Sequence, residues 1–319
     1  MSLPGLRTLH SGHAHHGWDR SLSPRLTVAP GETVTIACRD AGDGQIAPGS
    51  TEVAILTLDT DRANPLTGPI AVDGARPGDV LAVSILAFAP SGFGWTALIP
   101  GFGLLADQFP DPALHLWSYD TRGHAPLAFG RLAELPLAPF VGTIGTAPAD
   151  PGPHSVIPPR RTGGNMDVRD MRAGTVLYLP VEVDGALLSV GDTHAAQGDG
   201  EVCGTAIESA MEVTLKIDLL RGTPLAFPRY ETCGPRPGDT ARAGVVATTG
   251  IGPDLMQCCR DAVSGMIDHL SRSRSVSAAD AYMLCSVAAD LQISEIVDAP
   301  NWVVSCAIPR AIFADRASV

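Results

Sequence analysis

A glycine-rich segment over residues 191–201 packs three carboxylates and one imidazole into eleven positions. It directly follows an apolar run that predicts a β-strand. If this strand continues, its two-residue period places Asp192 and His194 on one face, where both side chains can converge on a single ion. Asp199 and Glu201 repeat this spacing, and the glycines between the pairs allow a tight fold of the backbone. These residue types at this spacing predict a site suited to metal-dependent hydrolysis.

The donor set favours a divalent cation. Aspartate and histidine suit zinc or manganese better than calcium, which prefers all-oxygen ligands. Clustered carboxylates would repel one another if they were buried without a counter-ion, so a cation is their natural neutraliser. We therefore expect a divalent metal, with zinc as the first choice and calcium or manganese as alternatives. The plain alternative for Asp192 and His194 is a histidine hydrogen-bonded to a carboxylate at a strand end.

Activated water is the reagent that such a metal would supply. The pKa of water falls from about 15.7 to roughly 7 on a metal, which at about 1.4 kcal/mol per unit is on the order of 12 kcal/mol of help toward hydroxide. The hydrolysis of an inert amide needs help of that size. A carboxylate that stays off the metal, which we take to be Glu201, would accept the proton from water and pass it to the leaving nitrogen.

Five further polar side chains are candidates, each with a structural alternative. Asn165 and Asp167 lie in a short polar stretch that would also fit a plain turn. Asp40 ends the first strong strand and would fit a turn equally well. His16 is retained from the N-terminal histidines, because the others fit a solvated terminus. Glu208 lies close to the glycine-rich segment, on a strand whose other charged residues are typical of a solvated face.

Other hydrolytic mechanisms fit the sequence less well. It contains no Gly-x-Ser-x-Gly elbow, and Ser189 has the wrong glycine spacing for one. Cys203 is conceivable as a nucleophile, but amidases of the nitrilase type also need a lysine. The only lysine, Lys216, lies thirteen residues further along a strand with charged neighbours. The seven cysteines are odd in number and show no Cys-x-x-Cys spacing, so we expect reduced thiols.

Composition excludes some classes of partner. The 319 residues carry a formal net charge of −12, and phosphate binding needs a basic face, so we expect no nucleic acid partner. The longest apolar stretch, residues 80–89, is interrupted by Ser84 and is too short to cross a bilayer, so we expect no membrane partner. The first 18 residues contain no apolar core of a secretory signal. We therefore expect a cytoplasmic protein.

Turn signals and apolar runs indicate a mainly β protein with its helices late in the chain. The predicted strands lie at residues 33–37, 80–88, 175–181, 207–219 and 302–308. Amphipathic helices are predicted from Asp254 and from Ser277. Short strands between glycine and proline turns favour a sandwich or barrel, so the expected class is α+β, mainly β. A proline-rich stretch over residues 147–161 is the clearest break in composition.

Three strings of residues, 163–167, 178–181 and 189–201, carry a family resemblance, and the last contains Gly-Asp-x-His followed by Gly-Asp-Gly-Glu. In these strings the chain resembles the acetamidase/formamidase family. Further similar segments occur in the expected order at residues 16–18, 40–46, 64–69, 101–105, 142–145 and 298–304. The resemblance covers nearly the whole chain, and its longest motif is highly specific.

The resemblance implies hydrolysis of short aliphatic amides such as formamide or acetamide to the carboxylate and ammonia. Some relatives act on small lactams, so a γ-lactam hydrolase is an alternative. The resemblance also implies a homo-oligomer and a jelly-roll-like β-sandwich with a mixed α/β portion toward the C-terminus. We divide the chain into an N-terminal β-sandwich half, residues 1–160, and a β-rich α+β half, residues 161–319, that carries the site and packs closely on the first.

These arguments assign a role to each candidate. The expected metal ligands are Asp192 and His194, completed by Asp40 or Glu208; the expected catalytic residues are Glu201, Asp199 and Asn165; and the residues expected to bind a small neutral amide are His16, Asp167 and Gln197. A competing class is a non-catalytic β-sandwich module with a structural ion. Only 5% of the residues are aromatic, which leaves few stacking platforms for the ligands of such a module.

Overall fold

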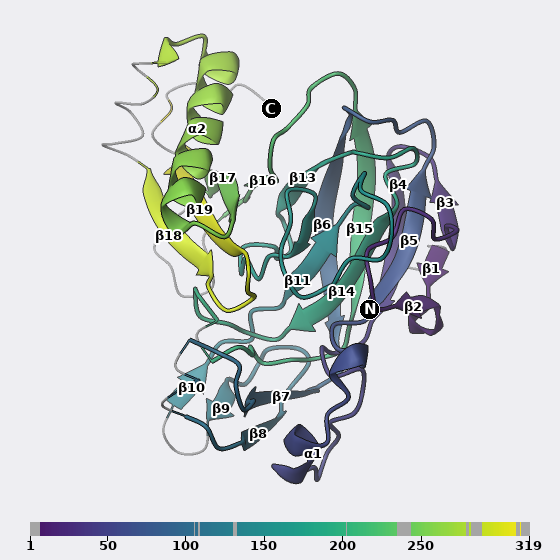
Figure 1. Ribbon diagram of the computed structural model, residues 1–319, viewed down its shortest axis with the longest axis vertical. Coiled ribbons are helices and arrows are strands. Elements are labelled where there is room, and N and C mark those ends of the chain that lie inside the picture. Colours follow the sequence, from purple (N-terminus) through teal and green to yellow (C-terminus); the bar gives the residue numbers. More distant parts are fainter. Residues whose placement is uncertain are drawn as a thin grey trace.

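Two open β-sheets that face each other make up most of the protein (Figure 1). The computed structural model describes residues 7–104, 106–107, 109–129, 133–201, 203–234, 244–278, 281, 289–310 and 313. The expected α+β class with a β majority is confirmed. The jelly-roll detail stays a prediction.

Nine strands form the larger sheet. In spatial order they are β1 (Arg7–Leu9), β4 (Glu32–Cys38), β15 (Met211–Leu220), β6 (Val80–Pro90), β13 (Val176–Pro180), β16 (Arg229–Glu231), β17 (Val245–Gly252), β19 (Trp302–Pro309) and β18 (Asp290–Glu295). The central strands bury one face, as the two-residue period predicts. In β15, Val213, Leu215 and Ile217 are fully buried while Lys216 is exposed.

Six strands form the smaller sheet, and β14 lies among them. In spatial order they are β12 (Gly163–Asn165), β11 (Phe140–Gly145), β14 (Leu188–His194), β5 (Leu66–Val72) and β2 (Ala14–His15), with β3 (Leu26–Val28) also paired to β5. β14 is buried along its whole length. It pairs with β11 on one side and with β5 on the other, so its polar residues cannot reach bulk water.

The main hydrophobic core lies between the two sheets. Ile36, Val83 and Leu215 from the larger sheet belong to the same buried cluster as Ile144 and Val190 from the smaller one. Full burial of such a side chain stabilises the fold by about 1.5–3 kcal/mol. The core therefore fixes the position of β14 against the larger sheet.

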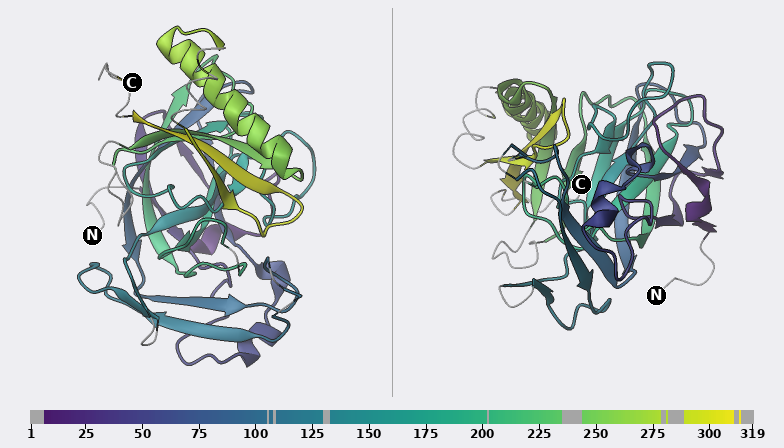
Figure 2. Two further views of the ribbon diagram at one scale, coloured as in Figure 1. Left: turned by 90° about the vertical axis from the view of Figure 1, so that its left-hand side faces the viewer. Right: turned by 60° about the horizontal axis from the view of Figure 1, so that its bottom comes forward.

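A single long helix covers one end of the larger sheet. α2 (Leu255–Arg274) packs over β17 and β19 (Figures 1 and 2). Asp254 caps its start by accepting a hydrogen bond of 2.8 Å from the backbone N–H of Gln257. Its buried face presents Cys258, Ala262 and Met266, so the first predicted helix is confirmed. The second, from Ser277, lies mostly outside the described residues.

Short elements gather beyond the end of β14 (Figure 1). They are the hairpin of β7 (Phe93–Leu98) and β8 (Ala113–Ser118), the hairpin of β9 (Leu127–Phe129) and β10 (Ala133–Leu135), and the helix α1 (Val53–Leu56). Two 3-10 turns, η1 (Ser11–His13) and η2 (Thr60–Arg62), complete the described elements.

The predicted strands are found, with one difference. β15 begins at Met211 rather than at residue 207. The backbone of Glu208 instead pairs with Trp95 and His194, and Ser209 donates to the Thr193 carbonyl at 3.0 Å. The alternating pattern therefore continues past the sheet into the predicted site.

Strands from before and after residue 160 enter both sheets. β15 lies between β4 and β6, and β14 lies between β11 and β5. The division at residue 160 stays a prediction, and the two parts share their core. Among the described helices, none has the length and apolar character needed to cross a membrane.

Candidate active site

The end of β14 brings the predicted acid and imidazole groups together. Phe140 of β11 lies opposite His194, and the Glu208 backbone forms an isolated bridge with His194 from the other direction. Asp192, two residues earlier on β14, completes the group. Segments far apart along the chain therefore converge here because of the pairing between strands.

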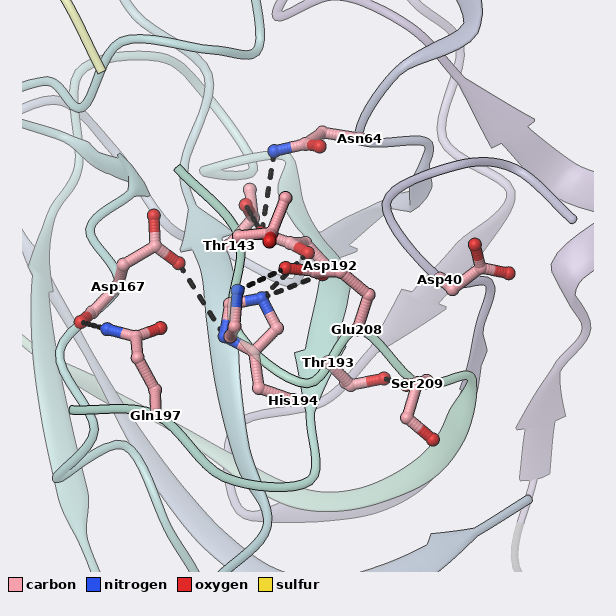
Figure 3. A network of polar contacts seen from close by, with 12 residues as sticks. Asp40, Asn64, Thr143, Asp167, Asp192, Thr193, His194, Gln197, Glu208 and Ser209 are labelled. Carbon is pink, nitrogen blue, oxygen red and sulfur yellow. Dashed lines mark hydrogen bonds and ion pairs between the residues drawn. The ribbon is translucent and has the colours of Figure 1, made fainter. Parts of the chain in front are cut away.

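Asp192, His194 and Glu208 form a buried triad. His194 Nε2 lies 3.0 Å from Asp192 Oδ1 and 3.1 Å from Glu208 Oε2 (Figure 3). The three side chains are exposed by only 1% for His194, 4% for Asp192 and 3% for Glu208. Each can offer one ligand atom such that all three atoms lie within 4.8 Å of one another. The predicted convergence of Asp192 and His194 is thus present, with Glu208 beside them.

A second group lies on the other side of the imidazole. Asp167 and Glu201 can also place ligand atoms within 4.8 Å of one another and of His194. Asp167 Oδ1 lies 3.9 Å from His194 Nδ1. Neither Asp167 oxygen nor His194 Nδ1 has a hydrogen-bond partner among the described residues. Gln197 Nε2 donates to the Asp167 carbonyl at 2.8 Å, while Gln197 Oε1 is buried and has no such partner.

Side chains from β11 and from the segment before β5 contact the other carboxylate oxygen of Asp192. Thr143 Oγ1 lies 3.2 Å and Asn64 Nδ2 lies 3.4 Å from Asp192 Oδ2. Asn64 Nδ2 also lies 3.2 Å from Asn165 Oδ1, to which Thr143 is hydrogen-bonded as well. Asn165 Nδ2 in turn donates to Asp298 Oδ2. Both ends of the Asn165 amide are therefore engaged, the oxygen by Asn64 and Thr143 and the nitrogen by Asp298.

Four residues of this network had no predicted role: Asn64, Thr143, Glu295 and Asp298. The first two and Asp298 fall within the family-like segments 64–69, 142–145 and 298–304, which was the available signal. Glu295 lies outside those segments, at the end of β18, where its Oε1 accepts the backbone N–H of Asp298 at 2.6 Å.

Several site residues adopt left-handed backbone conformations. The φ angles are 45° at Asn64, 47° at Asp167, 47° at Asp192 and 47° at Glu201. Such conformations cost free energy for residues other than glycine and cluster at functional sites. A left-handed residue inside β14 is unusual for a strand, and it turns the Asp192 carboxylate toward His194 and Thr143 (Figure 3).

Burial perturbs the carboxyl groups strongly. It raises the pKa of Asp167, Glu201 and Asp298 well above the usual range, and repulsion between the acids raises these pKa values further. Burial also raises the pKa of Glu208 and of Glu295 to about 7. Each raised pKa means that the ionised form of the acid is disfavoured. The positive charge near these carboxyl groups is therefore too small to offset their burial and mutual repulsion.

Asp192 and His194 behave as an ion pair. Burial opposes ionisation of Asp192, but the charge and hydrogen bond of His194 outweigh it and leave the Asp192 pKa below its usual value. Burial likewise opposes protonation of His194, but Glu208 and Asp192 outweigh it and hold the His194 pKa well above 6.5. One imidazolium neutralises only part of the acidic charge.

The residues fit a divalent cation. Six acids of this network are buried: Asp167, Asp192, Glu201, Glu208, Glu295 and Asp298. The first four lie around the His194 imidazole. Glu208 Oε2, both oxygens of Asp167 and Glu295 Oε2 accept no hydrogen bond from the described residues. Buried acceptors without donors are costly, and a cation satisfies several of them at once. Carboxylate and imidazole donors together suit zinc or manganese.

Five predicted site residues lie outside both ligand groups. Asn165 and Gln197 are described above, and the other three are Asp40, His16 and Asp199. Asp40 is separate from the triad (Figure 3), and its carboxylate accepts hydrogen bonds from Trp95 Nε1 at 3.0 Å and from two backbone N–H groups. His16 Nε2 lies 3.8 Å from Asp43, and its side chain is 33% exposed. Asp199 forms an ion pair of 2.7 Å with Arg169.

Gly142 provides a test of how tightly the site is packed. A Cβ at this position would lie 2.5 Å from Asp167 Oδ1 and 2.7 Å from His194 Cε1, so both side chains would have to move. We expect Gly142→Ala to lower kcat/KM for amides by about 10²-fold, the effect of a misplacement of roughly 1 Å. Gly12→Ala is the control, because its Cβ would meet nothing within 4 Å. Equal activity of the two variants would contradict this packing.

Comparisons with known proteins show what this chain is similar to. The sequence model of the Acetamidase/Formamidase family matches residues 7–156 and 152–315. An acetamidase from Mycolicibacterium smegmatis is 32% identical over 270 residues, which cover 65% of this chain and 66% of that protein. A formamidase from Methylophilus methylotrophus is 28% identical over 366 aligned positions, which cover 95% of this chain and 90% of that protein.

Solved structures show the same fold. The crystal structure of an acetamidase from Bacillus halodurans superposes with a TM-score of 0.86 at 32% identity, covering 96% of this chain and 98% of that one. A γ-lactamase from Delftia acidovorans shares the fold, with a TM-score of 0.67 at 24% identity. The chain belongs to the acetamidase/formamidase family.

Proposed function

We propose that this protein is a metal-dependent amidohydrolase that converts short aliphatic amides of the formamide or acetamide type to the carboxylate and ammonia. Membership of the family supports hydrolysis of carbon–nitrogen bonds in linear amides. The observation that carries the metal dependence is the buried triad of Asp192, His194 and Glu208, with unsatisfied acceptors around it.

Asp192, His194 and Glu208 would hold the cation, with zinc as the first candidate and manganese or calcium as alternatives. When bound, a divalent cation polarises the amide carbonyl and lowers the pKa of water. Thr143 and Asn64 orient the Asp192 carboxylate through the hydrogen bonds described above. Such outer contacts fix the ligand geometry.

Glu201 is the proposed general base. Its carboxyl group is buried beside Asp167, and burial raises its pKa, which makes the carboxylate a stronger base than an exposed glutamate. It would take a proton from the attacking water and give it to the leaving nitrogen. Gln197 Oε1, which lacks a partner among the described residues, would accept an N–H of the substrate carboxamide.

The other predicted residues have supporting parts in this proposal. Asn165 is a positioning residue, because both ends of its amide are engaged by protein groups. Asp167 would anchor Gln197 through its carbonyl, and Asp199 would hold Arg169. Asp40 would orient Trp95, whose backbone pairs with Glu208. His16 stays a candidate for contact with substrate.

The proposal includes the cellular setting. Five of the described cysteines are free thiols, which supports a reducing compartment such as the cytoplasm: Cys38, Cys203, Cys233, Cys258 and Cys259. The substrate is a small neutral amide, and neither nucleic acid nor a membrane is a partner. The homo-oligomeric state, which light scattering would measure, is part of the same proposal.

Ammonia release tests the function directly. Formamide, acetamide and a γ-lactam are offered to the protein before and after chelation, and again after zinc, manganese or calcium is restored separately. Release of ammonia from linear amides that depends on the metal supports the proposal. If no amide yields ammonia with any metal while chelation still lowers thermal stability, the ion is structural and the protein is a binding module.

Replacing Glu201 tests the proton transfer. We expect Glu201→Gln to lower kcat by about 10²–10⁴-fold with unchanged metal stoichiometry, because the amide cannot accept the proton. Glu212→Gln on β15 is the control, since Glu212 is half-buried on that strand and outside the ligand groups. Near-normal turnover of Glu201→Gln would remove Glu201 from this role, and loss of the metal would make it a ligand instead.

A further inference from the structure

A cavity of about 580 Å³ opens directly beside the candidate site. Gln197 and Glu201 line it, and so does a largely apolar wall made of Trp117, Phe129, Leu135, Pro136, Ala196 and Ile207. We infer that this cavity holds the acyl group of the substrate, and that the preferred substrates are primary amides whose acyl group carries about five to eight carbons. The inference rests on the proposed amide hydrolysis and names the substrate class.

The smallest amides fill only a small part of the cavity. Formamide has three heavy atoms and acetamide has four; at about 30 Å³ for each, the share of one water molecule, acetamide fills roughly 120 Å³. Hexanamide and phenylacetamide, with eight and ten heavy atoms, fill roughly 240 and 300 Å³ on the same scale. These amides fill roughly 40–50% of the cavity, whereas acetamide fills roughly 20% and would leave most of the apolar wall wet.

The cavity is continuous with the groups that would handle the carboxamide. Glu201 belongs to the ligand group with Asp167 and His194, and Gln197 is bonded to the Asp167 carbonyl. Ala196, on the cavity wall, lies two residues after His194. A carboxamide bound at Gln197 and Glu201 therefore has its acyl group directed along the apolar wall.

The aromatic part of the wall is pre-formed. Trp117 of β8 and Phe129 of β9 lie with ring centroids 5.6 Å apart, and Trp117 Nε1 donates to Thr96 Oγ1 at 3.0 Å. Phe129 is 39% exposed, which is unusual for a phenylalanine that serves only the core. An aliphatic or aromatic acyl group would cover this surface and release its water.

The charged residues on the lining do not call for a charged substrate. Arg169 is paired with Asp199 at 2.7 Å, and Arg172 donates to the Gly234 carbonyl. The ion pair neutralises one of the two guanidinium groups inside the cavity lining itself. Most of the other lining residues are apolar, and the polar ones among them are Thr96, Gln197, Glu201, Cys203 and Thr205. The apolar part favours a neutral apolar group.

A series of primary amides tests the inference with the metal-loaded enzyme. We expect kcat/KM to rise about fourfold per methylene from acetamide to hexanamide, the equivalent of about 0.8 kcal/mol per buried CH₂, or on the order of 10²-fold over the series. The gain should lie mainly in KM, because the acyl group makes the same contacts before and during the reaction. Phenylacetamide should behave like hexanamide.

Phe129→Ala and Phe109→Ala form a matched pair of variants. Both phenylalanines are surface residues, exposed by 39% and 53%, but only Phe129 lines the cavity. We expect the ratio of kcat/KM for phenylacetamide to that for acetamide to fall about fivefold or more in Phe129→Ala and to stay unchanged in Phe109→Ala. Exposed positions such as these leave the fold intact.

Two results would overturn the inference: a flat or falling kcat/KM along the series, or an unchanged ratio in Phe129→Ala. A change of oligomeric mass in Phe129→Ala would also overturn it, because the wall would then be a subunit contact. If not even formamide is hydrolysed, the proposed function fails by itself. Calorimetry with phenylacetamide then decides about the cavity: binding that weakens in Phe129→Ala supports the inference, and absence of binding overturns it.

Discussion

His194→Gln is expected to lower kcat/KM for amide hydrolysis by 10³-fold or more. His194 belongs to both groups of residues that could hold a cation, so its loss removes a ligand from either arrangement. A catalytic metal supplies several kcal/mol of transition-state stabilisation, which corresponds to a factor of this size. Ammonia release and metal content, measured on the same preparation, should fall together.

His269→Gln is the matched control for this variant. His269 lies on α2, partly buried, and contacts Arg229 Nη1 through its Nδ1 at 2.8 Å, away from the acidic cluster. Its substitution should change kcat/KM less than about twofold. If His194→Gln keeps its metal and its turnover, the imidazole is a structural partner of Asp192 and the metal-dependent mechanism is wrong.

Removal of the metal is expected to abolish activity and to weaken the fold. Chelation leaves several buried carboxyl groups with one imidazole as their counter-charge, and a buried charge that loses its partner costs about 3–5 kcal/mol. Thermal unfolding followed with and without chelator measures the loss. Restoring one divalent metal should restore both the melting temperature and ammonia release.

The stability of the metal-free protein should fall as pH rises. Glu208 and Glu295 each have a folded pKa of about 7, raised from 4.5 by burial. Their contribution is complete below pH 4.5 and is lost as pH rises to 7, by up to about 3 kcal/mol for each group. Urea unfolding between pH 4.5 and 8 would measure this slope.

Glu295→Gln separates this effect from other titrations. Glutamine Oε1 can still accept the backbone N–H groups that Glu295 Oε1 accepts, but the side chain does not titrate. The metal-free variant should be more stable than the metal-free wild type at pH 8 by about 3 kcal/mol, and equally stable near pH 4.5. A variant that is less stable at pH 8 would contradict the burial of an uncompensated acid.

The central elements of the fold were predictable because their signals are local. The alternation of β15, the apolar runs of β6 and β19, and the capped start of α2 each lie within a short window of sequence. The order of strands in the sheets was not predictable, because β4, β15 and β6 become neighbours through contacts over more than a hundred residues. The start of β15 was misplaced for a related reason: Glu208 leaves the sheet to pair with His194.

The site was predictable where its residues share one motif. Asp192, His194 and Glu201 stand close together in the sequence, and the structure brings both Asp192 and Glu201 to the His194 imidazole. Thr143 and Asp298 reach the site only through the pairing of β11 with β14 and through the segment after β18. The family-like segments that contain them were the signal, but nothing in those segments indicated a role for either residue. Asp40 was predicted as a possible ligand because it is an acidic residue at a strand end. In the sequence, such a residue looks the same whether it binds a metal or, as Asp40 does, accepts hydrogen bonds from Trp95 and two backbone N–H groups.

The polar network of the site is drawn from positions between Asn64 and Asp298, so no short fragment of the chain contains it. During synthesis on the ribosome, Asp192 and His194 emerge long before Asp298 does. Full assembly of the network around the proposed cation site would therefore wait until the segment with Asp298 has docked. A nascent or truncated chain would then compete poorly for the free metal of the cell. Binding of the proposed cation would indicate that the chain has finished folding.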